Sequence, residues 1–174
     1  MTIKLKLIME TMNNQDLLAR INVLFSSDII TSEEQFDTLI IEVAPSKVHE
    51  TILGLKIDSE LSFNFLTLLG AVHYPDNKDR EIAMVYHLHS WKTNCRLRIK
   101  TYLGIEKPEI ATITDIFDGA NWLERETYDF FGVNFIGHPN MTRILNEDSM
   151  DYFPLRKEFA LEDGTREDKD DRYF

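Results

Sequence analysis

The sequence predicts an α+β fold with two layers, in which helices cover one side of a mixed β-sheet, followed by an extended C-terminal tail. Helical periods and alternating strand patterns both occur before residue 132. Apolar residues make up 43% of the 174 residues, which is enough to bury a core. After residue 132 no period is sustained. We therefore expect an α+β domain over 1–132 and an extended segment over 133–174.

The N-terminal part is predicted to alternate helices and a strand. The spacing of apolar residues over 13–27 is typical of an amphipathic helix. Residues 37–43 are rich in β-branched side chains and precede a proline, so they predict a strand. A second helix is predicted over 46–53, because Gly54 follows as a plausible stop.

The most apolar stretch is 61–74, which predicts a short helix and then a strand because its first half fits a helical period. Residues 81–91 and 95–103 alternate between apolar and polar positions across a short connection, which predicts a β-hairpin. A third helix is predicted over 120–131. It is expected to end at Gly132, where a left-handed C-cap is common.

Composition excludes several classes of function. The formal charge of −11 repels nucleic acids and anionic lipid surfaces. Against this charge, the alternation of Arg96, Arg98 and Lys100 on one strand indicates either a solvated face or a surface for an acidic partner. A single cysteine, Cys95, excludes an internal disulfide and a self-contained thiolate cluster. We expect no cofactor in this chain.

The chain gives no sign of membrane insertion or export. Its apolar runs are far shorter than the roughly 18–20 residues that span a bilayer. No small-residue cleavage site follows the N-terminal stretch 1–10. We expect a protein without a direct membrane span that stays unprocessed on the cytosolic side.

Histidines and the cysteine offer weak site candidates. His87 and His89 share one face of a strand and, with His73, could suggest a metal site, but no acidic third ligand is evident. Paired strand histidines are the favoured interpretation. Cys95 has no partner histidine in a recognisable signature, so a buried cysteine is expected.

The densest unusual chemistry lies on the third predicted helix. Its charges include Glu124 and Glu126, which point roughly 200° apart on a helix and cannot act as one acid–base pair. A hydrolase hypothesis would use Glu126, Asp129 and His138 as acid and base. No nucleophile elbow, phosphate loop or metalloprotease motif accompanies them, so we predict no catalytic residue. Composition alone favours a solvated helix face and a turn at His138-Pro139.

Residues 121–145 closely resemble the signature of the C subunit, or 30 kDa subunit family, of respiratory complex I, the NADH-quinone oxidoreductase. The segment 151–159 is similar to the family's closing segment, with Tyr152-Phe153 in place of Gly-His. The resemblance implies a cofactor-free, peripheral subunit of the hydrophilic arm, on the cytoplasmic side of the bacterial inner membrane. It also implies docking on the quinone-site D subunit and on the B subunit, with FMN, iron–sulfur clusters and quinone held by partner subunits.

By this resemblance the charged and turn residues form a partner interface, where guanidinium groups hold carboxylates across a desolvated surface. We then expect Arg143→Ala to weaken assembly more than folding. The alternatives are the equivalent subunit of an energy-converting membrane-bound nickel–iron hydrogenase or ferredoxin-linked complex, and an unrelated acidic adaptor; the electron donor stays open. The expected interface residues are Glu124, Arg125, Glu126, Asp129, Gly132, Gly137, His138, Pro139, Arg143, Arg156 and Lys157.

Overall fold

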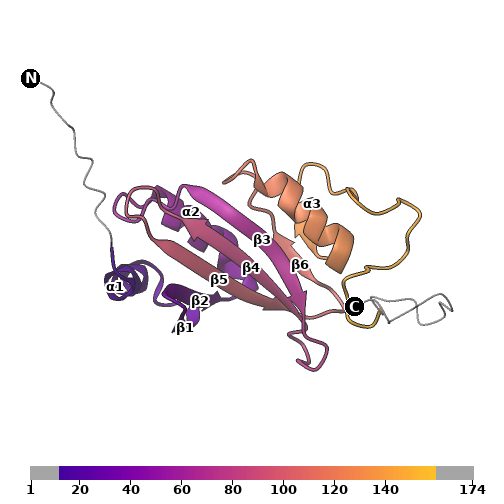
Figure 1. Cartoon of the computed structure of the whole chain (residues 1–174), viewed down its shortest axis with the longest axis horizontal. Coiled ribbons are helices and arrows are strands. Elements are labelled where there is room, and N and C mark those ends of the chain that lie inside the picture. The colour runs from indigo at the N-terminus through magenta and orange to yellow at the C-terminus, as the bar shows by residue number, and fades with distance from the viewer. Residues whose placement is uncertain (1–11, 160–174) are drawn as a thin grey trace, which may run out of the picture.

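The computed structural model describes residues 12–159, which form a five-stranded sheet, a small two-stranded sheet and three α-helices (Figure 1). The strand order in the large sheet is β1-β2-β5-β4-β3. Within this sheet only the β2–β5 pair is parallel, so the predicted mixed sheet is confirmed. The strands of this sheet are β1 (Ile29–Gln35), β2 (Thr38–Val43), β3 (Phe65–His73), β4 (Ile82–His89) and β5 (Arg96–Leu103).

The first two helices cover one side of the sheet. In Figure 1 α2 lies behind the strands, and the near face of the sheet carries no helix. α1 (Asn14–Phe25) begins where the Asn13 side chain accepts a hydrogen bond from the Asp16 N–H, a regular N-cap. A 3₁₀ turn over Pro45–Lys47 leads directly into α2 (Val48–Ile57).

Strand alternation decides which side chains enter the core. In β4, Ile82, Met84, Tyr86 and Leu88 are all buried and face the helices, as the pattern predicts. Apolar side chains of α1, α2 and the 110–117 loop pack against them. The largest fully buried side chains are those of Tyr86, Phe63, Phe135, Leu17, Ile21, Ile40, Ile41, Ile52, Leu55, Leu61, Ile82 and Met84.

The prediction that α2 stops before Gly54 is wrong, because the helix continues to Ile57. A Cβ at Gly54 would lie 2.5 Å from Phe25 Cζ. This glycine therefore permits the close approach of α1 and α2 and does not end the helix.

The prediction of a helix in the first half of 61–74 is also wrong. Residues 65–73 form one continuous strand, β3, paired antiparallel with β4. A bulge between Leu66 and Leu68 shifts the register by one residue and disguises the strand alternation in the sequence. β1 was not predicted, because its residues are almost all exposed and lack an apolar period.

The last elements are α3 (Ala120–Phe131) and two short strands. β6 (Glu109–Ala111) pairs in parallel with β7 (Asn134–Ile136), so regular structure continues past residue 132. α3 ends at Gly132 with φ +78°, the left-handed C-cap that the sequence predicts. Figure 1 shows the following segment looping back beside α3. No helix within residues 12–159 has the length and hydrophobicity to cross a bilayer.

Candidate functional site

The segment 137–159 folds against α3, and we call this helix and segment together the tail clasp. At its centre lies Asp129, whose side chain is fully buried. Its Oδ2 accepts hydrogen bonds from the backbone N–H groups of Ile144, Leu145 and Asn146, at 3.1, 2.8 and 2.9 Å. One carboxylate thus satisfies three consecutive amides of a segment that has no secondary structure to do so.

Arg143 completes this arrangement. Its Nη1 lies 2.7 Å from Asp129 Oδ1 and also donates to the Asp129 carbonyl. Its Nη2 donates to the carbonyls of Met150 and Tyr152, at 2.7 and 3.2 Å. The guanidinium therefore fixes the helix and two turns of the tail relative to one another.

The Asp129 carboxylate is ionised over a wide pH range. Burial alone would raise its pKa, but the N–H groups of Asn146 and Leu145 and the Arg143 guanidinium outweigh burial. Together they hold the pKa of Asp129 far below its ordinary value. The clasp is therefore built around a permanent negative charge that is neutralised within the chain.

Two further arginines tie the tail to α3. Arg125 donates to the carbonyl and hydroxyl of Thr142 and to the carbonyl of Arg143, each at 3.1 Å, and its guanidinium lies 5.2 Å from the Trp122 ring centroid. Arg156 Nε donates to the Phe131 carbonyl at 2.8 Å. Burial lowers the pKa of Arg156, an effect that Glu158 partly offsets.

The far end of the tail reaches β3. The Lys157 N–H donates to His73 Nδ1 at 2.9 Å, and its ammonium lies 5.6 Å from the Tyr74 ring centroid. An apolar cavity of about 550 Å³ lies between this end of the tail and β3. It is lined by Ala71, Val72, His73, Phe131, Pro154, Leu155, Arg156, Lys157 and Phe159.

Glu124 lies on another face of α3 and forms no hydrogen bond with tail residues 137–159. It is fully buried, and its carboxylate accepts from the Thr112 hydroxyl at 2.5 Å and from the Ile113 N–H at 2.8 Å. Burial raises the pKa of Glu124 to about 7, against the opposing effect of these two donors. The expectation of a solvated helix face is thus wrong for both Glu124 and Asp129.

The hydrolase hypothesis finds no support in this geometry. Glu126 is exposed, Asp129 is engaged by Arg143 and the tail amides, and His138 Nε2 lies 3.2 Å from the carbonyl of Asn121. His138 Nδ1 in turn accepts from the Asn140 N–H, which forms the predicted turn beside Pro139. Within residues 12–159 no group of three or more His, Cys, Asp or Glu side chains could hold a metal ion.

The histidines occupy different environments. The His87 and His89 side chains point to the same face of β4, as predicted, and His73 lies on the opposite, buried face of β3. Cys95 is buried, and its thiol donates to the Met12 carbonyl at 2.9 Å.

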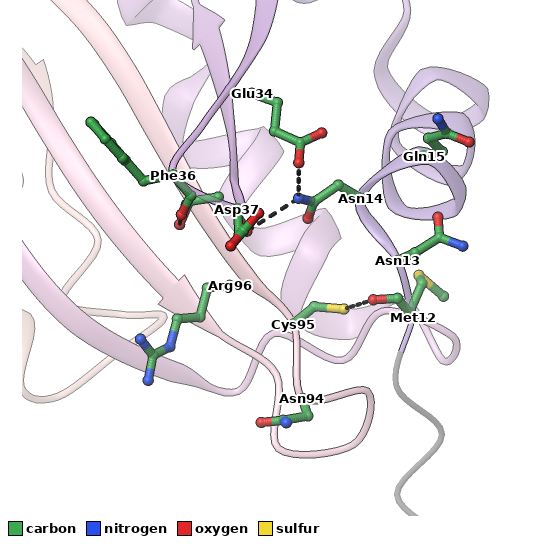
Figure 2. A pocket seen from close by; sticks show the side chains of 11 residues that line it. Met12, Asn13, Asn14, Gln15, Glu34, Phe36, Asp37, Asn94, Cys95 and Arg96 are labelled. Carbon is green, nitrogen blue, oxygen red and sulfur yellow. Dashed lines mark hydrogen bonds between the residues drawn. The ribbon is translucent and has the colours of Figure 1, made fainter.

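Figure 2 shows a pocket beside Cys95, with a volume of about 730 Å³. Asn14 Nδ2 donates there to Glu34 Oε1 and to the Asp37 carbonyl, at 2.9 and 3.1 Å. Among the residues that the structure describes, no histidine lines this pocket to activate the thiol. Its residues are Met12, Asn13, Asn14, Gln15, Glu34, Phe36, Asp37, Thr38, Asn94, Cys95 and Arg96.

Sequence reasoning named the charged residues of the tail clasp but missed their partners. The three amides that bind Asp129 and the carbonyls that bind Arg143 are backbone groups, which carry no sequence signal. Apolar side chains also remain exposed along the clasp. These are Trp122, Leu145, Tyr152, Leu155 and Phe159.

Comparison with known proteins assigns the chain to a family. A family model described as "Respiratory-chain NADH dehydrogenase, 30 Kd subunit" matches residues 41–165. The chain is 35% identical over 150 residues to the NADH-quinone oxidoreductase C subunit of Roseiflexus sp., covering 86% of each chain. It is 34% identical to the C subunit of the same enzyme from Xanthobacter autotrophicus, covering 86% of this chain and 70% of that protein.

A mitochondrial relative is longer. The chain is 45% identical over 123 residues to the NADH dehydrogenase [ubiquinone] iron-sulfur protein 3 of Candida albicans, covering 71% of this chain. The match spans 43% of that protein, so the chain corresponds to under half of its length.

Two solved structures share the fold. One is described as a trypsin-resistant fragment of Nqo5, with a TM-score of 0.62 and 29% identity over 74% of this chain and 99% of the fragment. The other belongs to a membrane-bound sulfane sulfur reductase, an archaeal respiratory membrane complex, with a TM-score of 0.71 and 25% identity over 84% of this chain and 85% of that one. With the family model and the curated relatives in agreement, the chain belongs to the 30 kDa subunit family of respiratory-chain NADH dehydrogenase, which includes the bacterial C subunits of NADH-quinone oxidoreductase.

Proposed function

We propose that this chain is a non-catalytic, cofactor-free subunit of the peripheral arm of a proton-translocating NADH- or ferredoxin-quinone oxidoreductase, on the cytoplasmic side of the membrane. It docks through the tail clasp on the quinone-site D subunit, with the B subunit as a neighbour. FMN, iron–sulfur clusters and quinone belong to the partner subunits. The chain supports electron transfer to quinone by holding these partners in place.

The observation that carries this proposal is the surface of the tail clasp. Its central charges are satisfied inside the chain, because Asp129 and Arg143 bind each other and the tail backbone. The exposed side chains of the clasp include several large apolar ones, led by Leu145 at 64% and Trp122 at 61% exposure. Exposed aromatic and aliphatic side chains on a rigid support are typical of the centre of a protein interface.

This arrangement gives the interface charges an indirect role. Arg125, Asp129 and Arg143 hold the tail in one conformation before docking, so its entropy is not lost again on binding. The apolar side chains then supply the buried area. Glu126, which is exposed, remains available for a direct contact with a partner.

The proposal is tested by isolating the complex from solubilised membranes through a tag on this chain. Leu145→Asp and Trp122→Ala are compared with Val23→Asp, a similarly exposed position on α1. We expect the first two variants to lose the D and B subunits and quinone-dependent activity, with unchanged circular dichroism. Retention of the complex by both variants would contradict docking through the clasp.

A second candidate is the equivalent subunit of a related membrane-bound respiratory complex. The archaeal sulfane sulfur reductase chain aligns with 84% of this chain, more than the Nqo5 fragment does. The same isolation distinguishes the two. An NADH-oxidising module among the purified subunits supports the first assignment, and a hydrogenase or sulfur reductase module supports the second.

A further inference from the structure

The face of the large sheet opposite α2 is open and carries basic and aromatic side chains. On β5, Arg96 and Arg98 point to this face, and the register places them beside His89 and His87 of β4. Figure 1 shows this near face without a covering helix. We call it the open face and define it by Phe65, Leu68, His87, Trp91, Arg96 and Arg98.

Arg98 is held in place by a neutral acceptor. Its Nε donates to His87 Nε2 at 3.1 Å. Burial and the neighbouring Arg98 lower the pKa of His87, so the imidazole stays uncharged and can accept this hydrogen bond near neutral pH. Within residues 12–159 the two terminal nitrogens of Arg98 have no hydrogen-bond partner. They form a preorganised fork of the kind that binds a carboxylate.

Arg96 is equally free among the residues that the structure describes. It is exposed and has no carboxylate within salt-bridge distance there, whereas the neighbouring Lys100 lies 3.3 Å from Glu33. Figure 2 shows the Arg96 side chain extending away from Asn14 and Glu34. Within residues 12–159, Arg96 and Arg98 thus present two guanidinium groups without a carboxylate partner, on a chain that carries a charge of −11.

Aromatic side chains flank the two arginines. Trp91 is 59% exposed and lies 5.7 Å from the Phe65 ring and 5.0 Å from the His89 ring, between centroids. Leu68 is also exposed, on the same face of β3. Tryptophan and arginine are the residue types most enriched among interface hot spots.

We propose that the open face is a second docking surface, which binds an acidic segment of another protein through Arg96 and Arg98 while apolar side chains cover Trp91 and Phe65. Arginines two residues apart on a strand are separated by about 7 Å. An extended segment with acidic residues at i and i+2 matches this spacing. The surface is distinct from the tail clasp, and its role does not depend on which respiratory complex holds the chain.

Charge favours a protein segment over other occupants. The net charge of −11 opposes the binding of a nucleic acid. A second copy of this acidic chain would bring the same repulsion. The chain's own residues 160–174 contain six acidic but also three basic side chains, which weakens their attraction to two arginines.

The first experiment places a photoreactive benzoyl-phenylalanine at Leu68 of the full chain in cells. A control chain carries it at Val23, which is exposed on α1. After irradiation, the cross-linked peptides are identified by mass spectrometry. We expect Leu68 to cross-link to one segment of another protein with carboxylates at i and i+2. Cross-links to a second copy, to residues 160–174 or to nucleic acid, or a yield no higher than at Val23, would overturn the proposal.

The second experiment tests the charges. Arg98→Glu is compared with Lys107→Glu, an exposed position with the same charge change. We expect Arg98→Glu to reduce the Leu68 cross-link about tenfold or more and Lys107→Glu to leave it unchanged. Reversing an acidic residue of the cross-linked segment to arginine should then restore the yield in Arg98→Glu, which a misfolded variant would not allow. A cross-link yield that is insensitive to Arg98→Glu contradicts the proposal. This outcome does not depend on whether the tail clasp is found to dock on partner subunits.

Discussion

Arg143 Nη1 lies 2.7 Å from Asp129 Oδ1, and both side chains are almost completely buried at the junction of α3 and the tail. The pair is fourteen residues apart in sequence and is surrounded by backbone donors and acceptors that it satisfies. The pair therefore fixes the tail against α3. The apolar side chains that lie exposed on the tail clasp are the ones we expect partners to contact.

Asp129→Asn removes the charge at the centre of the clasp. We expect the tail to detach locally. The free energy that holds it against α3 should fall by about 3–5 kcal/mol, because Arg143 would be left buried without its carboxylate. Limited proteolysis within 137–159 measures this directly. Glu126→Gln, an exposed neighbour on the same helix, is the matched control. Equal cleavage of both variants would show that Asp129 does not fix the tail against α3.

Acid should open the same clasp in the native chain. The folded-state pKa of Asp129 lies below its ordinary value of 3.8. Its stabilising contribution is therefore complete above that value and is lost as the pH falls below it. Hydrogen exchange of the Leu145 and Asn146 amides should accelerate below pH 4 in the native chain. In Asp129→Asn the exchange rates, corrected for intrinsic chemistry, should show no such acid transition.

Arg143→Ala is expected from the sequence alone to weaken assembly more than folding. The structure gives Arg143 partners inside the chain, so the variant should first loosen residues 143–156. The sheet core, which Arg143 does not touch, should unfold at an unchanged denaturant concentration. Hydrogen exchange resolves the two regions. A uniform loss of protection over both would show that the tail and the core unfold as one unit.

Glu124→Gln should remove a pH dependence of folding stability that is opposite in sign to the one expected for Asp129. The pKa of Glu124 is raised from 4.5 to about 7, so between these values the folded chain holds a proton that the unfolded chain releases. Stability therefore falls as the pH rises through this window, by about 3 kcal/mol in total. The neutral glutamine escapes this loss and can still accept from Ile113 and donate to Thr112. Urea unfolding at pH 5 and pH 8 measures the difference.

The comparison between the native chain and Glu124→Gln isolates this one group, because other titrating residues contribute equally to both. Glu126→Gln serves as the control, since Glu126 is exposed. We expect the native and Glu124→Gln stabilities to converge at pH 5 and to separate at pH 8. Parallel pH profiles for the two proteins would contradict the raised pKa.

Much of the fold could be predicted, because β4, β5 and α3 carry clean periods that agree with their burial. The wrong predictions for β3 and for the end of α2 have physical causes. The β3 strand is an edge strand with a bulge, so its apolar side chains do not alternate, and pairing with β4 decides its conformation. Gly54 reads locally as a helix stop, but its role depends on Phe25, which lies twenty-nine residues earlier.

The charged residues of the tail clasp could be named from the sequence, but their contacts could not be predicted from it. The resemblance to the family implied that Asp129 and Arg143 are interface charges, but their pairing depends on the path of the tail, and its backbone donors have no sequence signature. Arg125 shows the same limit. Its i, i+4 spacing indicates a pair with Asp129, whereas tertiary contacts direct it to Thr142.

Gly132→Ala should disturb both α3 and the tail. Gly132 has φ +78°, and an added Cβ would lie 2.5 Å from the Phe153 ring and 2.7 Å from Arg156 Nη2. The backbone strain alone costs roughly 1–2 kcal/mol, and Phe153 must also move. Gly70→Ala is the control, because a Cβ there meets nothing within 4 Å. The midpoint temperature of thermal unfolding should fall clearly for Gly132→Ala and change little for Gly70→Ala.

The β1–β2 hairpin offers a stabilising change. Phe36 and Asp37 form its two-residue turn with φ of 50° and 59°, a conformation that L-residues other than asparagine and aspartate disfavour. Phe36 is 98% exposed, so its ring gains nothing from packing within the described structure. The double variant Phe36→Asn, Asp37→Gly matches the preferred turn sequence and keeps the Asp37 carbonyl that accepts from Asn14. We expect it to raise the free energy of unfolding by about 1 kcal/mol. A higher urea midpoint with an unchanged m-value would confirm this, and a lower midpoint would mean that the ring makes a stabilising contact after all.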